Sequence, residues 1–210
     1  MVIGITGGVG SGKSTINDIL RDKYGYRILL TDDMAKELEE PGQKVYRELV
    51  KAFGDKILEP SADGNEKAVR KIDKSAFAYL IYNDPEVKKQ AEEIIHPATW
   101  SWCEDIIREE QEKGEAKVVV ESALPCERYR KMCDEIWFIY TREEIRIRRL
   151  MESRGYSLEK CESIIAGQLP DEAFIGYADY IIDNSGSFEE TSLRVTELME
   201  PEVMPQEDRV

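Results

Sequence analysis

Residues 1–15 read MVIGITGGVGSGKST, and this stretch decides the fold. A short apolar run comes first, and the pattern G-x-x-x-x-G-K-[ST] of a Walker A loop follows from Gly7 to Ser14. The glycines allow backbone angles that a Cβ atom would forbid, so successive N–H groups can turn toward phosphate oxygens. A helix that begins just after the loop would point its positive end at the same anion. The stretch therefore predicts a strand, a phosphate-binding loop and a helix over residues 15–23.

The residue types in the loop predict which nucleotide it binds. The Lys13 ammonium can reach the β- and γ-phosphates of a nucleoside triphosphate, and the Ser14 hydroxyl can bind Mg²⁺. A glycine-rich turn that contains Lys-Ser by chance is the alternative, but it does not explain the strand before and the helix after. We therefore expect ATP and Mg²⁺ as cofactors. The residues expected to contact the nucleotide are Gly8, Val9, Gly10, Ser11, Gly12, Lys13, Ser14 and Thr15.

Composition limits the remaining possibilities. The chain has 210 residues, 41% of them hydrophobic, which is enough for one α/β core with a small inserted subdomain. Its formal net charge of −14 argues against nucleic acid or an anionic membrane as a partner. The four cysteines have no C-x-x-C spacing, and a single histidine excludes a His-based metal site. We expect a cytoplasmic protein that is a monomer or a small homo-oligomer.

Asp32 is the first candidate for chemistry outside the loop. It follows a second apolar segment, residues 24–31, which predicts the next strand of a parallel sheet. The C-terminal end of such a strand lies beside the phosphate-binding loop. Asp32 could therefore accept a proton from an attacking hydroxyl. It could equally cap a helix expected over residues 34–40, and both roles remain open here.

The middle of the chain predicts helices with no strand between them. Pro41-Gly42 ends one helix, and helices are expected over residues 44–53, 67–82 and 85–95, with a turn-rich loop at 58–66. We interpret residues 34–113 as a helical substrate-binding insertion together with the helix that returns to the sheet. His96 lies at an expected helix junction within it, where it could bind substrate or serve only the structure.

The second half of the chain predicts three more strands. Residues 117–121, KVVVE, form a buried strand that ends in Glu121, and strands follow over 135–140 and 178–182. A carboxylate at the end of such a strand could hold Mg²⁺ opposite Ser14, or it could be an ordinary strand-end acid. The expected fold is α/β, a five-stranded parallel sheet flanked by helices. Its core comprises residues 1–33 and 114–200, and a flexible tail covers 201–210.

Five arginines gather between residues 141 and 155, at positions 142, 146, 148, 149 and 154. Arg142, Arg146 and Arg149 have the spacing of one helical face, and arginine suits bidentate contact with phosphate. The alternative is a solvated helix that pairs with neighbouring glutamates. Arg154-Gly155 and Ser157 predict a helix stop and restart. We interpret residues 142–170 as a short helical lid over ATP.

Together these motifs resemble the dephospho-CoA kinase family over nearly the whole chain. The resemblance is carried by IGITGGVGSGKST, by the D-x-x-A-x-x-x-x-E-P-G run from Asp32 to Gly42, and by YNDPEVKKQAEEIIHP at 82–97. RRLMESRG at 148–155, Gln168-Leu169-Pro170 and ADYIIDNSGS at 178–187 complete it. It implies a P-loop kinase fold and transfer of the ATP γ-phosphate to the 3′-hydroxyl of dephospho-CoA.

The resemblance also implies roles for particular residues. Asp32 matches the catalytic aspartate, and Lys13 and Arg149 match residues that act on the phosphates. Asn184 lies in the turn similar to the family's adenine-side loop. The remaining expected contacts are Arg154 with the nucleotide and Lys36 and His96, with Asp32, on the substrate side.

Four positions depart from the common family pattern. Leu30-Thr31 precedes Asp32 where an acid often stands, Glu121 replaces an aspartate, Ser153 replaces a second arginine, and Phe174 occupies a region that is often basic. These departures keep two alternatives open. One is another P-loop small-molecule kinase, for example one acting on a nucleoside monophosphate. The other is a catalytically weakened nucleotide-binding homologue.

Overall fold

The computed structural model describes residues 1–61, 69–114 and 116–201. The chain divides into two compact units. The first comprises Met1–Leu29 and Ile107–Val210, and the second comprises Leu30–Ile106. The sequence-based division fell a few residues later at both boundaries, at 33/34 and 113/114. Of the tail expected over 201–210, residues 202–210 lie outside the described part of the chain.

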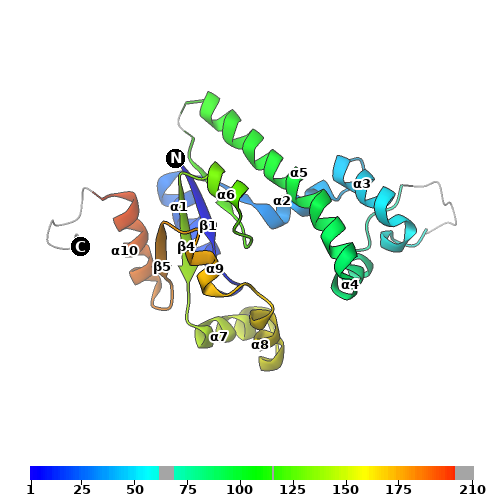
Figure 1. The fold of residues 1–210 in the computed structure, drawn as a ribbon. Coiled ribbons are helices and arrows are strands. Elements are labelled where there is room, and N and C mark those ends of the chain that lie inside the picture. Colours follow the sequence, from blue (N-terminus) through cyan, green and yellow to red (C-terminus); the bar gives the residue numbers. More distant parts are fainter. Residues whose placement is uncertain (62–68, 115, 202–210) are drawn as a thin grey trace. The chain divides into compact units, whose positions relative to one another are not determined.

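The first unit is built on a five-stranded parallel sheet with the order β2-β3-β1-β4-β5. Figure 1 labels three of these strands, β1, β4 and β5. The strands are β1 (Val2–Thr6), β2 (Arg27–Leu30), β3 (Val118–Glu121), β4 (Glu135–Tyr140) and β5 (Tyr180–Asp183). The central strand β1 is buried along its whole length, as expected for a parallel strand covered on both faces. The predicted parallel sheet is confirmed, although β2 is shorter than residues 24–31 and β5 begins later than residue 178.

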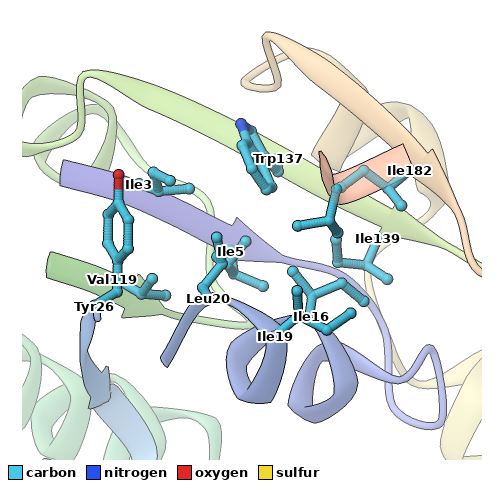
Figure 2. Close-up of a cluster of buried hydrophobic side chains, with 11 residues drawn as sticks. Ile3, Ile5, Ile16, Ile19, Leu20, Tyr26, Val119, Trp137, Ile139 and Ile182 are labelled. Atoms are coloured by element: carbon cyan, nitrogen blue, oxygen red, sulfur yellow. The ribbon is translucent and has the colours of Figure 1, made fainter. Parts of the chain in front are cut away.

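Alternate side chains of each strand point to opposite sides of the sheet. Helices cover both of the faces that result. On one face, Ile3 and Ile5 pack against Ile16 and Leu20 of α1 (Lys13–Tyr24), as Figure 2 shows. Val195 of α10 (Phe188–Met199) belongs to the same cluster. This packing fixes α1 against β1, and therefore fixes both ends of the loop between them.

Two short helices, α6 (Glu127–Met132) and α9 (Asp171–Ile175), cover the other face. The Tyr129 hydroxyl of α6 donates a hydrogen bond to the Val120 carbonyl at 3.0 Å. Phe174 of α9 stacks on Phe138 with 5.3 Å between ring centroids. The core therefore extends through the sheet, with β1 at its centre.

The helix stop and restart predicted around Gly155 are present as α7 (Glu143–Arg154) and α8 (Leu158–Ala166). Gly155 ends α7 in the left-handed conformation with φ 65°, and the Ser157 side chain caps α8 by accepting from the Lys160 N–H. One detail differs, because Arg142 is the N-cap of α7 and lies outside the helix. The helical period therefore does not place it on one face with Arg146 and Arg149.

The second unit is helical. It contains α2 (Thr31–Leu38), α3 (Lys44–Phe53), the 3₁₀-helix η1 (Gly54–Ile57), α4 (Lys74–Asn83) and the first part of α5 (Pro85–Glu112). Its core contains buried side chains from these elements. They are Val45, Tyr46, Leu49, Ile57, Ile72, Phe77 and Ala91. The helix predicted over 44–53 is confirmed, whereas the one predicted from residue 67 begins at Lys74, and residues 67–68 lie outside the described chain.

The helix junction predicted at His96-Pro97 is wrong. The structure instead contains one helix of 28 residues, α5, with Pro97 inside it. A proline within a helix removes one backbone hydrogen bond and costs about 3 kcal/mol. The apolar stripe of the helix nevertheless continues past Pro97, from Ala91 to the buried Trp100 and Cys103. The burial of residues before and after Pro97 stabilises the helix more than the proline destabilises it.

Candidate nucleotide-binding site

The phosphate-binding loop has the backbone geometry that its glycines permit. Gly7, Gly10 and Gly12 have φ of 147°, 76° and 85°. The Lys13 ammonium donates to the Gly7 carbonyl at 2.9 Å and to the Gly8 carbonyl at 3.4 Å, so the side chain folds back over the loop. α1 begins directly at Lys13, two residues earlier than predicted. The loop therefore leads directly into the N-terminus of α1, which is the positive end of the helix dipole.

Helix α7 contacts the loop through Arg146. Its Nε donates to the Val9 carbonyl at 2.9 Å, and its Nη2 donates to Gln168 Oε1 at 2.7 Å. The same Gln168 oxygen accepts from the Val9 N–H at 2.9 Å. Arg146 is 9% exposed. Arg146 and Gln168 therefore form hydrogen bonds with the backbone carbonyl and the backbone N–H of Val9.

A second set of contacts meets at the Ser11 carbonyl. It accepts from Asn184 Nδ2 at 2.7 Å, from Thr141 Oγ1 at 2.9 Å and from Arg149 Nη1 at 3.4 Å. Arg149 Nη2 also donates to the Asn184 carbonyl at 2.9 Å. Thr141 directly follows β4, and Asn184 directly follows β5. The carboxyl ends of these two strands therefore support the loop from outside, as the edge of a parallel sheet commonly does for a ligand site.

The two arginines at the loop keep their charge at neutral pH. Burial lowers the pKa of Arg146, and burial together with the neighbouring Arg148 lowers the pKa of Arg149. Both shifts start from a value so high that each guanidinium stays protonated at neutral pH. In a chain with net charge −14, positive charge is thus concentrated beside the phosphate-binding loop.

The loop itself fits an anion. Within the part of the chain that the structure describes, the backbone N–H of Gly12 donates to no acceptor. A Cβ atom on Gly8 would lie 2.3 Å from Arg146 Nη2, and one on Gly12 would lie 2.1 Å from Asn184 Nδ2. Gly12 also has a φ of 85°, which favours glycine there, whereas at Gly8 the ends of the Arg146 and Gln168 side chains occupy the space of a Cβ. The result is a loop with open N–H donors and a cationic border, which suits nucleotide phosphates.

The predicted metal ligands lie at the ends of α1 and β3. The Ser14 hydroxyl belongs to an exposed residue, and Glu121 is half-buried at the end of its strand. Glu121 accepts from the Asn17 amide, and its Oε1 lies 3.9 Å from Lys13 Nζ. Among residues 1–61, 69–114 and 116–201, no group of three His, Cys, Asp or Glu could hold a metal. Mg²⁺ bound to phosphates needs only one or two protein oxygens, so Ser14 and Glu121 fit it.

A cavity of about 590 Å³ opens beside the lid helices. Its walls come from the end of β4, from α7, from the end of α8 and from the segment that leads to α9. The lining residues are Tyr140, Thr141, Glu143, Arg146, Ile165, Ala166, Gln168, Leu169, Pro170 and Asp171. Arg146 and Gln168 therefore border this cavity as well as the loop.

The other lid arginines have different neighbours. Arg142 Nη1 lies 3.7 Å from Glu144 Oε1, so part of the cluster does pair with glutamate. The Arg154 guanidinium lies 6.0 Å from the centre of the Tyr156 ring. Contact between Arg154 and a nucleotide stays a prediction, whereas Arg146 and Arg149 already contact the loop.

The substrate-side candidates lie in the helical unit. Asp32 is exposed in the first turn of α2, whose N-cap is Leu30, so its interpretation as a capping residue is wrong. The helix starts earlier than expected because Thr31 is buried and takes part in it. Lys36 Nζ lies 2.7 Å from Asp33 Oδ1. His96 is half-buried in α5.

Lys36 also lines a cavity of about 480 Å³ in this unit. Lys71 and Lys74 share the lining with Lys36, together with Glu39, Glu40, Glu59 and three further residues. Burial raises the pKa of Glu39, and the charges of Lys74 and Lys36 oppose that rise. Four carboxylates, those of Glu39, Glu40, Glu59 and Asp73, face the same cavity, so its three ammonium groups do not make it cationic.

Sequence reasoning missed three residues of the site. Asn17, Thr141 and Thr191 are buried polar residues that hold Glu121, Ser11 and Asn184 respectively. Asn17 carried a usable signal, because it is a polar residue four positions after Lys13 on a buried part of α1. Thr141 and Thr191 are recognisable only once β4, β5 and α10 have been assembled.

A β-strand, a Walker A loop and a helix at the centre of a five-stranded parallel sheet, with paired helices that bring arginines to the loop, define a P-loop kinase. The family model described as dephospho-CoA kinase matches residues 1–190. The chain belongs to the dephospho-CoA kinase family.

Curated relatives and solved structures agree with this assignment. The chain is 35% identical over 198 residues to "Dephospho-CoA kinase" of Geobacter sulfurreducens, which covers 94% of this chain and 96% of that one. It is 34% identical to the Streptococcus mutans protein of the same name, covering 92% and 93%. Among solved structures, dephospho-CoA kinase from Campylobacter jejuni has a TM-score of 0.66 at 23% identity, covering 97% and 98%. Shikimate kinase from Acinetobacter baumannii has a TM-score of 0.51 at 13% identity, covering 97% and 95%. These two structures support the fold alone.

Proposed function

We propose that the protein transfers the γ-phosphoryl group of ATP to the 3′-hydroxyl of dephospho-CoA, giving ADP and coenzyme A. The observation that carries this proposal is the match of residues 1–190 to the dephospho-CoA kinase family. The geometry of the loop supports it on the ATP side, because the Walker A backbone, Lys13 and Arg149 gather donors and positive charge in one place. The comparisons do not favour another acceptor, or a homologue that has lost catalysis.

On the donor side, the chain's own groups bind and orient the phosphates. Loop N–H groups without an acceptor among the described residues, such as that of Gly12, face them, and the Lys13 ammonium leaves the loop carbonyls to meet the β- and γ-phosphates. Arg149 and Arg154 add positive charge from the lid, which compensates the charge that spreads over the transferred group. Arg149 is already held beside the loop, since it donates to the Ser11 carbonyl.

Ser14 and Glu121 would hold Mg²⁺, directly or through water. The ion, when bound, neutralises charge on the β- and γ-phosphates. Glu121 is one methylene longer than aspartate, and the Asn17 amide holds its Oε2. The hydrogen bond from Asn17 restricts the longer side chain and keeps a carboxylate oxygen available at the end of β3.

Asp32 is the proposed general base, which accepts the proton of the attacking 3′-hydroxyl. The residue lies two positions after the end of β2, in the first turn of α2, and it is exposed. Because Leu30 stands two positions earlier, Asp32 carries this role without a second acid. Lys36 and His96 are the proposed contacts for the acceptor; Lys36 lines a cavity of the helical unit, and His96 is half-buried in α5.

Two departures from the family pattern have structural explanations. Phe174 stands in a region that is often basic, but its ring is 2% exposed and stacks on Phe138, so α9 is held by packing. Ser153 replaces an arginine, and its hydroxyl donates to the Arg149 carbonyl at 2.6 Å. Phe174 packs on the face of the sheet, and Ser153 forms a hydrogen bond within α7. They leave the phosphate contacts to Arg149 and Arg154.

The proposal also covers the setting in which the protein works. We expect a cytoplasmic enzyme, either a monomer or a small homo-oligomer, with no nucleic-acid partner. The net charge of −14 disfavours contact with nucleic acid. Separately, the described residues contain no helix long and apolar enough to cross a membrane.

A coupled ADP-release assay with a panel of acceptors tests the function. The panel contains dephospho-CoA, shikimate and nucleoside monophosphates, with mass spectrometry of the products. Of these acceptors, we expect only dephospho-CoA to cause ADP release, and its product should carry one more phosphoryl group. Turnover with shikimate or a nucleoside monophosphate, and none with dephospho-CoA, would overturn the proposal. ADP binding without transfer to any acceptor would identify a homologue without catalysis.

A further inference from the structure

Asn184 is a buried amide with a hydrogen bond at each end. The residue is 4% exposed and directly follows β5. Its Nδ2 lies 2.7 Å from the Ser11 carbonyl, and its Oδ1 lies 2.7 Å from the Thr191 hydroxyl of α10. Its backbone N–H donates to the Tyr140 carbonyl at 2.8 Å. The side chain therefore connects α10 to the phosphate-binding loop.

The neighbours determine which way the amide points. A carbonyl oxygen only accepts, so the Ser11 carbonyl requires the NH₂ end of the amide. The oxygen end must then face Thr191, whose hydroxyl can donate to it. Thr191 is fully buried, and its hydroxyl also lies 3.1 Å from the Ser187 carbonyl. The reverse orientation would place two acceptors against each other at Ser11.

Holding the Ser11 carbonyl also orients the next N–H. The Ser11–Gly12 peptide is trans, as are the other described peptide bonds, so its carbonyl and its N–H point in opposite directions. The carbonyl points toward Asn184 and Thr141, and the Gly12 N–H points away from them. That N–H has no acceptor among the described residues and begins the helix that faces the phosphate site. We propose that Asn184 is a positioning residue, which turns the Gly12 N–H toward the bound phosphate.

The residue at Gly12 agrees with this role. Its φ of 85° lies in the left-handed region, and a Cβ there would lie 2.1 Å from Asn184 Nδ2. The amide thus occupies the space that a side chain would need. Arg146 acts in the same way at the Val9–Gly10 peptide. It donates to the Val9 carbonyl, so the Gly10 N–H points to the opposite side.

The inference rests on the proposed function only in that the loop binds phosphate, and binding assays test it without the transfer reaction. Calorimetry would measure ADP and tripolyphosphate binding to Asn184→Asp and Asn184→Ala. Asp keeps the shape but loses the donor and places a negative oxygen beside the Ser11 carbonyl. We expect both variants to bind ADP about five- to thirtyfold more weakly, the effect of one lost buried hydrogen bond. The affinity for tripolyphosphate, which has no base, should fall by the same factor.

Variants at neighbouring positions provide the controls. Thr191→Val removes the donor that orients the amide and should weaken ADP binding, and Thr191→Ser should restore it. Ser185→Ala alters the same turn, where the hydroxyl accepts from the Arg142 N–H, and should change ADP affinity less than twofold. The KM for ATP should rise in the Asn184 variants while the KM for dephospho-CoA stays within twofold. Thermal unfolding confirms that each variant is folded.

Three results would overturn the inference. Unchanged ADP affinity in Asn184→Asp would show that shape alone matters at this position. Weaker ADP binding with unchanged tripolyphosphate binding would show that Asn184 contacts the base. Absence of ADP binding by the unaltered protein would overturn nucleotide binding altogether. A protein that binds ADP with the expected Asn184 dependence, yet transfers nothing to dephospho-CoA, would support this inference and contradict the proposed function.

Discussion

Replacing Arg146 by alanine removes the side chain that links the lid helix to the phosphate-binding loop. Two hydrogen bonds disappear, one from Nε to the Val9 carbonyl at 2.9 Å and one from Nη2 to Gln168 Oε1 at 2.7 Å. Gln168 keeps its contact with the Val9 N–H, but the Val9 carbonyl loses its donor. The loop should then sample conformations in which the Gly10 N–H no longer faces the phosphate site.

The size of the effect follows from these two contacts. A hydrogen bond from a charged donor contributes about 1.5–3 kcal/mol, and Val9 is only half-buried, so water replaces part of the loss. We expect a total cost of about 2–3 kcal/mol. If the cost falls on the loop conformation that binds nucleotide, ADP affinity should fall by about 30- to 140-fold. If it falls on the fold instead, the melting temperature should fall by about 4–12 °C.

Calorimetric titration with ADP, together with thermal unfolding of the same samples, separates these two outcomes. Arg148→Ala is the matched control, because Arg148 belongs to the same helix and is exposed. It removes the same charge without touching the loop. We expect Arg148→Ala to change ADP affinity by less than threefold and to leave the melting temperature nearly unchanged.

The reasoning fails if Arg146→Ala lowers the melting temperature but leaves ADP affinity within threefold of the unaltered protein. Arg146 would then stabilise the fold without shaping the loop. It also fails if Arg148→Ala weakens ADP binding as much as Arg146→Ala does. The positive charge of α7 would then act at long range, and the specific hydrogen bonds would have no special role.

Four further predictions use other assays. Asp32→Asn should leave ADP binding nearly intact and lower turnover about 10²- to 10⁴-fold, the usual effect of a general base, and a change under threefold would contradict that role. Glu121→Gln should raise the Mg²⁺ concentration that gives half-maximal turnover, and an unchanged Mg²⁺ profile would exclude Glu121 as a ligand. Gly12→Ala should abolish ADP binding measured by calorimetry, whereas Gly25→Ala, also at positive φ but with open space around it, should cost only about 1–2 kcal/mol of stability. Burial raises the pKa of Glu39 above its ordinary value of 4.5, so its contribution to stability is complete below pH 4.5 and is lost as the pH rises through the raised pKa. Glu39→Gln should therefore raise the melting temperature at pH 7, and this advantage should disappear near pH 4.

Much of the fold could be predicted because its signals are local. The buried strands at 135–140 and 118–121, the helix over 44–53 and the stop and restart between Arg154 and Ser157 all follow from short patterns of apolar, capping and turn residues. The prediction failed where packing outweighed a local rule. Pro97 did not end α5, because the buried stripe of the helix continues beyond it. Thr31 joined α2, which excludes capping, one of the two roles left open for Asp32.

The sequence by itself determined the phosphate-binding loop and the class of chemistry. A Walker A loop depends on glycines, Lys13 and Ser14 that are adjacent in the chain, so its function can be deduced without knowledge of distant contacts. Only the tertiary structure decided how the loop is held. Arg146, Gln168 and Asn184 lie more than a hundred residues away in sequence, and a hydrogen bond to a loop carbonyl leaves no periodic pattern behind. Strands β4 and β5 bring these side chains to β1, so sheet assembly determines which arginine contacts the loop.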